Sequence, residues 1–258
     1  MTVLQIENCT KKFGGLIAVK DLDMALQQGD LYGLIGPNGA GKTTVFNLIT
    51  GVYAPDGGSI QLEKKSIHGL KPSTIAKLGI SRTFQNIRLF QSMTVLENVK
   101  LARHMRKKQN LADAVLRTGR LESEEEEIER DAMELLRIFN LDQRSAELAS
   151  SLPYGLQRRL EIARALATKP KVLLLDEPAA GMNPLEANDL MHLIQTIRDE
   201  FHLTILLVEH NMKVVMGVCE KIQVIDYGET IALGGPREIQ DDPRVIEAYL
   251  GKEHPWRA

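Results

Sequence analysis

Short apolar runs, each bounded by charged residues or glycine, recur along the chain at 31–35, 172–175, 205–208 and 222–225. Runs of this length without polar alternation are typical of strands buried on both faces of a parallel sheet. Segments with helical periodicity separate them, and strands that alternate with helices indicate an α/β fold. We therefore predict a mainly parallel sheet as the core of the chain.

Two regions of the chain, one near the N-terminus and one in the middle, depart from this pattern. Residues 3–13, 22–30 and 57–67 have the pattern of half-exposed strands joined by tight turns, which predicts a small antiparallel sheet beside the core. From 93 to about 140 the sequence is rich in charge and predicts helix. We expect an α/β core at 1–88 and 160–258 and an inserted helical subdomain at 89–159.

Within the helical segment, Ser123 and Glu126 have the spacing of a capping box, which predicts a helix start there. The acidic run 124–127 would then lie in the first helical turn, where the helix dipole favours negative charge. An apolar stripe at helical spacing follows, formed by Ile128, Ala132, Leu135, Leu136 and Phe139.

Composition narrows the class of protein. The chain has 258 residues, 43% of them hydrophobic, and a net charge of −2, which argues against a nucleic-acid-binding protein. Two distant cysteines, Cys9 and Cys219, form no disulfide framework and indicate a reducing compartment. The apolar runs are far shorter than the roughly 20 residues of a membrane span. We expect a cytosolic protein, or one bound to a membrane only through partners.

The segment after the first apolar run carries the strongest chemical signal. Residues 36–43 match G-x-x-x-x-G-K-[ST], the phosphate-binding loop, between an expected strand and an expected helix. Glycines let backbone N–H groups point at phosphate oxygens, while Lys42 adds a charge at the β- and γ-phosphates and Thr43 a hydroxyl for Mg²⁺. The candidate nucleotide-binding residues here are Gly36, Pro37, Asn38, Gly39, Ala40, Gly41, Lys42, Thr43 and Thr44.

Two further strand ends carry polar residues. The run at 172–175 is followed by Asp176, which we expect to hold Mg²⁺ through water, and by Glu177, a candidate general base. The run at 205–208 is followed by Glu209 and His210. Ligands of open α/β sheets bind at the carboxyl ends of strands, so His210 is predicted to reach a γ-phosphate.

The segment SLPYGLQRRLEIARAL, residues 151–166, predicts an amphipathic helix. Ser151 is an available cap upstream, and Arg158, Arg159 and Arg164 form the charged part of the pattern. A proline, a tyrosine and a glycine stand directly before the expected helix, which leaves open whether this segment only starts a helix or also binds a ligand.

Together these residues resemble the ATP-binding cassette family, the ATPase subunits of membrane transporters. The resemblance covers essentially the whole chain. Its motifs are an adenine-stacking aromatic (Phe13), Walker A (36–43), the Q-loop glutamine (Gln85), the signature usually written LSGGQ (Leu152, Pro153, Tyr154, Gly155, Leu156), Walker B (172–177), the D-loop (179–184) and the switch histidine (His210).

Within this family, the chain most resembles the larger ATPase subunit of bacterial high-affinity branched-chain amino-acid importers. The segments that carry this resemblance are FGGLIAV, RTFQNIRLF, LPYG, DEPAAGMNP and VIEAYLG. This resemblance implies a P-loop NTPase (RecA-like) core that binds ATP and Mg²⁺, with Thr43, Gln85 and Asp176 around the metal. It also implies catalysis by Glu177, His210 and Gln85.

The same resemblance implies partners. A second cassette, in a head-to-tail homo- or heterodimer, would place its ATP against residues 152–156 of this chain. Two membrane permease subunits, and indirectly a periplasmic binding protein, would complete a transporter with this chain at the cytoplasmic side of the membrane. No nucleic-acid partner is implied.

The chain departs from the family pattern at three positions. Pro153 replaces the signature serine, Leu156 replaces the usual glutamine, and Asn183 stands where aspartate is common. Each is expected to weaken contacts with the partner's nucleotide.

Four alternatives to branched-chain amino-acid import stay open. They are a urea or amide importer, a lipid or lipopolysaccharide exporter, a soluble cassette ATPase acting on DNA or ribosomes, and a nucleotide-gated module without turnover. The LPYG and AAGMNP segments favour the amino-acid or urea importers over the exporter, while a single cassette with a modest insert disfavours the DNA- or ribosome-acting class.

Overall fold

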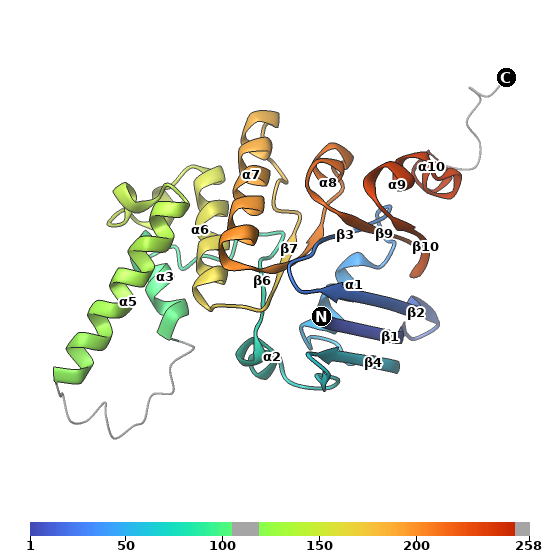
Figure 1. Cartoon of the computed structure of the whole chain (residues 1–258), viewed down its shortest axis with the longest axis horizontal. Helices are drawn as coiled ribbons and strands as arrows, with labels where there is room; N and C mark the ends of the chain where they lie inside the picture. The colour runs from blue at the N-terminus through green and yellow to red at the C-terminus, as the bar shows by residue number, and fades with distance from the viewer. Residues whose placement is uncertain (105–118, 251–258) are drawn as a thin grey trace. The chain divides into compact units, whose positions relative to one another are not determined.

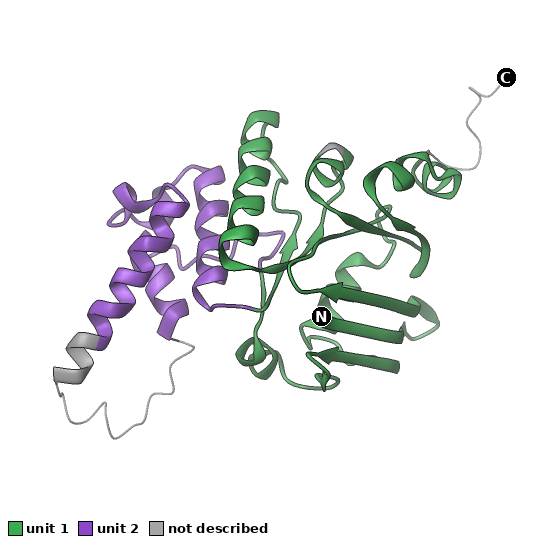
Figure 2. Cartoon of the chain, viewed as in Figure 1, with its two compact units in different colours: residues 1–82, 171–258 green, residues 83–170 purple. Residues whose placement is uncertain are grey.

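The computed structural model describes residues 1–104 and 119–250. The chain forms two compact units, residues 1–82 with 171–258, and residues 83–170 (Figure 2). The second unit includes the expected helical segment 89–159 and extends beyond it at both ends. It contains all of α6 (Tyr154–Ala167), because side chains of this helix bind the backbone of residues 84 and 85.

The first unit contains the mainly parallel sheet that the apolar runs predict. Its six strands lie in the order β10-β9-β3-β8-β7-β6, and each neighbouring pair is parallel except β9 and β10. The strands are β3 (Leu31–Ile35), β6 (Ile80–Arg82), β7 (Val172–Asp176), β8 (Thr204–Val208), β9 (Lys221–Asp226) and β10 (Glu229–Gly234).

The predicted antiparallel sheet is also present in the first unit (Figure 1). Its strands lie in the order β2-β1-β4-β5. They are β1 (Thr2–Phe13), β2 (Leu16–Gln27), β4 (Gly57–Leu62) and β5 (Lys65–Ser66). The prediction was possible because one face of this sheet is buried and the other is exposed, so apolar and polar residues alternate along each strand.

The larger sheet is covered on both faces, which explains its uninterrupted apolar strands. Tyr32 and Leu34 belong to one core cluster with α1 (Lys42–Ile49) and the antiparallel sheet. On the opposite face of the sheet, a Cβ added to Gly33 would lie 3.1 Å from the Cys219 Sγ and 3.3 Å from Val215 of α8. The remaining helices of this unit are α2 (Pro72–Leu78), α7 (Pro184–Phe201), α8 (Met212–Val218), α9 (Pro236–Asp241) and α10 (Pro243–Leu250).

The regular elements that the structure describes in the second unit are helices. It contains α3 (Val95–His104), α5 (Gly119–Ile138), α6 and two 3₁₀ turns, η1 (Asp142–Arg144) and η2 (Ala149–Ser151). The predicted stripe is confirmed as its core: Ile128, Ala132, Leu136 and Phe139 are at most 2% exposed, and Leu135 is half-buried.

The predicted helix start at Ser123 is wrong. α5 begins at Gly119, so Ser123 and the run 124–127 lie inside the helix. The glutamates that follow Ser123 are good helix formers, and the helix continues through them towards its N-terminus. The same pattern does form a capping box at α3, where Thr94 and Glu97 exchange hydrogen bonds of 2.7 and 3.1 Å.

None of the helices in residues 1–104 and 119–250 combines the length and the apolar character needed to cross a membrane.

Both cysteines are expected to be inert in the folded protein. Burial raises the pKa of the Cys9 thiol to about 11 and that of Cys219 to about 12, with further contributions from Asp56 at Cys9 and from Glu220 and Glu209 at Cys219. At pH 8, labelling by a thiol reagent should be more than about 100-fold slower in the folded than in the urea-unfolded chain. Rapid labelling of the folded protein by mass spectrometry would contradict this.

Candidate nucleotide site

The loop between β3 and α1 is held in a backbone conformation that only glycine allows at two positions. A Cβ at Gly36 (φ 155°) would lie 2.0 Å from the carbonyl oxygen of Ile225, and one at Gly41 (φ 106°) would lie 2.5 Å from that of Ala18. The Ala40 carbonyl accepts a 2.9 Å hydrogen bond from the Gly228 N–H, so the turn between β9 and β10 supports the loop. The loop is therefore a fixed cradle.

Lys42 lies folded over this cradle. Its Nζ donates to the carbonyls of Gly36 (2.6 Å) and Pro37 (2.9 Å), and the residue is 7% exposed. Burial lowers its pKa, an effect that Glu177 and Asp176 oppose through their negative charge. The cation thus stands close to two carboxylates and to the start of α1.

The start of α1 fits a phosphate group. Its cap residue is Gly41, which has no side chain to accept from the first N–H groups of the helix. Uncapped N–H groups at a helix start, together with a buried lysine, form an anion-binding site. The residues of the cradle therefore fit the phosphates of a nucleotide.

Asp176 ends β7, where the sequence predicts it, and is 6% exposed. Its Oδ2 accepts a 2.7 Å hydrogen bond from the Nη2 of Arg82, the last residue of β6. The Arg82 Nη1 donates to the Asn47 Oδ1 of α1 at 2.7 Å. Arg82 could not be predicted from the sequence, because no local pattern links it to a carboxylate on another strand.

Glu177 follows with a φ of 47°, in the left-handed region that non-glycine residues seldom adopt. Its N–H donates to the Val208 carbonyl at 2.8 Å, which ties this turn to the end of β8. Such strain persists where surrounding contacts fix the backbone, and it is common at functional sites.

His210 and Glu177 are brought together from different strand ends. The His210 Nδ1 lies 3.6 Å from the Glu177 Oε2 and 4.0 Å from the Glu209 Oε2, and the imidazole is 57% exposed. Glu209 itself is fully buried and accepts a 2.8 Å hydrogen bond from the Ala179 N–H. Burial raises the pKa of Glu209. The carboxylate of Glu209 therefore supports the turn after Glu177, a role the sequence did not indicate.

Phe13 lies at the exposed end of β1 and is 40% exposed. The Tyr53 ring packs edge-to-face against it, with 5.1 Å between centroids. An exposed aromatic face held by a second ring is suited to stacking on a nucleotide base.

Gln85 and the segment 152–156 belong to the second unit. Pro153 stands at the N-cap position of α6 but makes no side-chain hydrogen bond to the helix, and Tyr154 is the first helical residue. Ser151 is not the cap: its hydroxyl donates instead to the Leu148 carbonyl at 2.7 Å. Leu152 is buried, whereas Tyr154 is 45% exposed.

Arg158 is not part of a solvated charged face, as the helical pattern had suggested. It is fully buried and forms a 2.8 Å ion pair with Glu161, which is 2% exposed. Its guanidinium also donates to the carbonyls of Phe84 (2.6 Å) and Gln85 (2.7 Å). The Glu161 Oε1 accepts from the N–H of Arg88 at 3.2 Å. The ion pair thus fixes the 84–88 backbone to α6.

Asn183, a departure from the family pattern, has a structural role. It caps α7, accepting from the N–H groups of Leu185 and Glu186 at 3.0 Å, while the Glu186 carboxylate accepts from the Asn183 N–H. Asparagine and aspartate cap helices about equally well, so this exchange preserves the start of α7.

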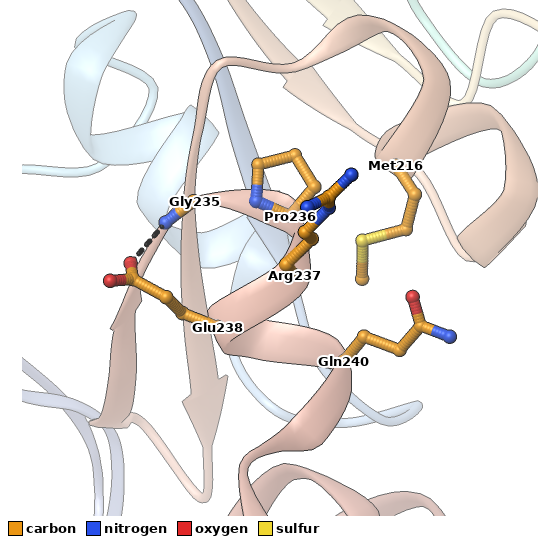
Figure 3. A pocket seen from close by; sticks show the side chains of 6 residues that line it. All are labelled: Met216, Gly235, Pro236, Arg237, Glu238 and Gln240. Carbon is orange, nitrogen blue, oxygen red and sulfur yellow. Dashed lines mark hydrogen bonds between the residues drawn. The ribbon is translucent and has the colours of Figure 1, made fainter.

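A hollow of about 540 Å³ lies at the start of α9 (Figure 3). It is lined by Met216, Gly235, Pro236, Arg237, Glu238 and Gln240, none of which is a predicted site residue. The Glu238 carboxylate accepts a 2.7 Å hydrogen bond from the Gly235 N–H at its rim.

The buried ion pair predicts a strong effect on stability. Replacing Arg158 by methionine leaves Glu161 buried without its partner, and such losses cost about 3–5 kcal/mol of unfolding free energy. The double variant R158M/E161L should lose less than the sum of the two single losses, because both charges are absent. Urea unfolding followed by circular dichroism measures this.

The matched control is R144M. Arg144 pairs with Glu147 at the same i,i+3 spacing, but both side chains are more than 40% exposed. Its replacement should change the unfolding free energy by about 0–1 kcal/mol. Equal losses at the two pairs would show that burial does not set the strength of the Arg158 interaction.

Comparison with known proteins gives concordant matches. A family model described as "ABC transporter" matches residues 19–180, and one described as "Branched-chain amino acid ATP-binding cassette transporter" matches residues 229–255. The high-affinity branched-chain amino acid transport ATP-binding protein LivG of Salmonella typhimurium is 46% identical, over 97% of this chain and 98% of LivG. The lipopolysaccharide export system ATP-binding protein LptB of Escherichia coli is 35% identical, over 98% and 99%.

Solved structures agree. The ADP conformation of MJ1267, an ATP-binding cassette of an ABC transporter, superposes with a TM-score of 0.84 at 32% identity, over 98% of this chain and all of that one. The ATP-binding cassette MJ0796, in a dimeric structure of a post-hydrolysis state bound to ADP and Pi, gives a TM-score of 0.76 at 26% identity, over 91% of this chain and 99% of that one.

Proposed function

Because the chain belongs to the ABC transporter family of ATP-binding proteins, we propose that it hydrolyses ATP to power the import of branched-chain amino acids. The observation that carries the substrate class is the 46% identity to LivG over nearly the whole chain. The family model for branched-chain amino-acid cassettes at residues 229–255 supports the same class. Lipopolysaccharide export is the second candidate, and the lower identity to LptB, 35%, disfavours it.

ATP is assigned to the cradle of residues 36–44. Its phosphates lie, in this proposal, against the start of α1 and Lys42, and its base against Phe13. Thr43 and Asp176 are the proposed residues around Mg²⁺, which when bound neutralises charge that develops on the phosphates. Gln85 is the third residue proposed around Mg²⁺, and only the family pattern supports its assignment.

Glu177 is the proposed general base. Its backbone has a φ of 47°, and its Oε2 lies 3.6 Å from the Nδ1 of His210. A carboxylate in this position accepts a proton from the attacking water, while His210 contacts the γ-phosphate. The buried Glu209 holds the intervening turn in place.

The assembly we propose contains two cassettes, two membrane permease subunits and a periplasmic binding protein. Residues 152–156 would face the ATP of a second cassette in a head-to-tail dimer. The dimeric structure of MJ0796 supports a dimer for a cassette of this fold. The chain would then lie at the cytoplasmic side of the membrane, held by the permease subunits.

Replacing Glu177 by glutamine tests the chemical assignment. The amide keeps the size of the side chain but cannot accept the proton, so steady-state ATP turnover should fall about 10²–10⁴-fold. ATP binding, measured by calorimetry, should stay within about twofold, since the cradle is unchanged. E200Q, at an exposed position of α7, should keep wild-type turnover. Wild-type turnover in E177Q would refute the general-base role.

Transport tests the substrate class. Deletion of the gene should abolish high-affinity uptake of labelled leucine, isoleucine and valine, and the wild-type gene, but not the E177Q gene, should restore it. Loss of urea uptake alone would assign the chain to an amide importer. Unchanged uptake of both, with a defect in lipopolysaccharide delivery, would favour the exporter.

A further inference from the structure

Arg82 is a buried cation that the proposed function does not use. Its side chain is 7% exposed, and its guanidinium contacts groups of two other elements, β7 and α1. It donates to the Asp176 carboxylate of β7 and to the Asn47 side chain of α1, both at 2.7 Å, and lies 5.2 Å from the centre of the Phe46 ring. Because Arg82 binds both α1, the helix that follows the phosphate cradle, and the Asp176 carboxylate, it is placed to set the distance between them.

The backbone gives Arg82 a fixed starting point. β6 pairs in parallel with β7, and Arg82 stands opposite Leu174, two residues before Asp176. The guanidinium therefore reaches Asp176 from the neighbouring strand of the same sheet, and not from a loop. Its planar fork lets two of its nitrogens bind two acceptors at once, which a lysine ammonium does with less directional control.

The environment makes these contacts strong. The Asp176 side chain is 8% exposed, so its carboxylate is largely removed from water. A buried carboxylate without a partner is costly, and one paired with arginine keeps both its charge and its orientation. The contact with the Phe46 ring adds a cation–π interaction that further restrains the guanidinium.

We propose that Arg82 is a positioning residue for the magnesium site: it holds the Asp176 carboxylate at a fixed place relative to α1, and thus to the nucleotide phosphates. This inference rests on the proposed function, which assigns Asp176 to Mg²⁺. Arg82 touches neither the nucleotide nor the metal in this proposal and acts through Asp176. Groups that hydrogen-bond metal-binding carboxylates typically change metal affinity 10–100-fold when replaced.

The proposal separates two quantities that a general structural role would change together. One is the affinity for ADP in EDTA, which depends on the cradle and on Lys42. The other is the factor by which Mg²⁺ raises that affinity, here called the magnesium increment. Loss of Arg82 should lower the magnesium increment and leave the affinity in EDTA unchanged.

The experiment is calorimetric titration of ADP, with MgCl₂ or with EDTA, into the purified full chain. The wild type should show a magnesium increment, and D176N should lose it. R82M should lower the increment by roughly tenfold or more while its affinity in EDTA stays within about twofold. The double variant R82M/D176N should match D176N alone, because Arg82 acts only through that carboxylate.

R82K is the second variant, since methionine at a buried cationic position can prevent folding. Lysine keeps the charge but cannot donate to Asp176 and Asn47 with the fixed geometry of a guanidinium. The magnesium increment of R82K should therefore lie between those of the wild type and R82M. R244M is the matched control: Arg244 also pairs with an aspartate, Asp242, at 2.8 Å, but its side chain is 68% exposed. Its affinities should equal those of the wild type.

The outcomes are distinct. A full magnesium increment in R82M and R82K, with the increment lost in D176N, would overturn the role of Arg82 and leave the proposed function intact. Parallel losses in EDTA and in Mg²⁺ would also overturn it, by showing that Arg82 only supports α1. An unchanged increment in D176N would instead refute the metal assignment of the proposed function.

Discussion

The burial of charge at the carboxyl ends of parallel strands is the constraint on which this site depends. Lys42, Asp176 and Glu209 are each at most 7% exposed, and each would cost several kcal/mol if it were buried without a partner. Backbone groups satisfy two of them: the carbonyls of the phosphate cradle bind Lys42, and the Ala179 N–H binds Glu209. Asp176 is held by another charged side chain, Arg82. Contacts within the chain therefore hold all three charged side chains in place.

Backbone geometry also fixes the positions of groups in this site. Gly36 is packed so closely on the β9 backbone that an added Cβ would lie 2.0 Å from a carbonyl oxygen. Glu177 adopts a left-handed conformation that costs about 1–3 kcal/mol, and the hydrogen bond to Val208 helps to maintain it. As a result, the carboxylate of Glu177 and the imidazole of His210 meet although they follow different strands.

Local patterns were sufficient to predict the strands, the glycine-rich loop before α1 and the carboxylates at the end of β7. Each of these leaves a contiguous signal: an apolar run, a glycine spacing, or an acid at a strand end. Arg82 leaves none, because its partner Asp176 lies 94 residues away and only the parallel pairing of β6 with β7 brings them together. The buried side of α6 was missed for a related reason. Arg158 and Glu161 have the spacing of an ordinary surface pair, and their burial depends on the 84–88 segment.

The start of α6 shows how a departure from a family pattern can be understood from helix chemistry. A serine at position 153 would be a good cap, and its hydroxyl would accept from N–H groups of the first helical turn. Pro153 has no such acceptor, and the structure shows no side-chain cap on this helix. Among the residues that the structure describes, no side chain caps the first N–H groups of α6, which is the condition under which a helix start binds an anion. The exchange of serine for proline removes one hydroxyl contact, but it leaves the backbone groups of this helix end available to an external phosphate.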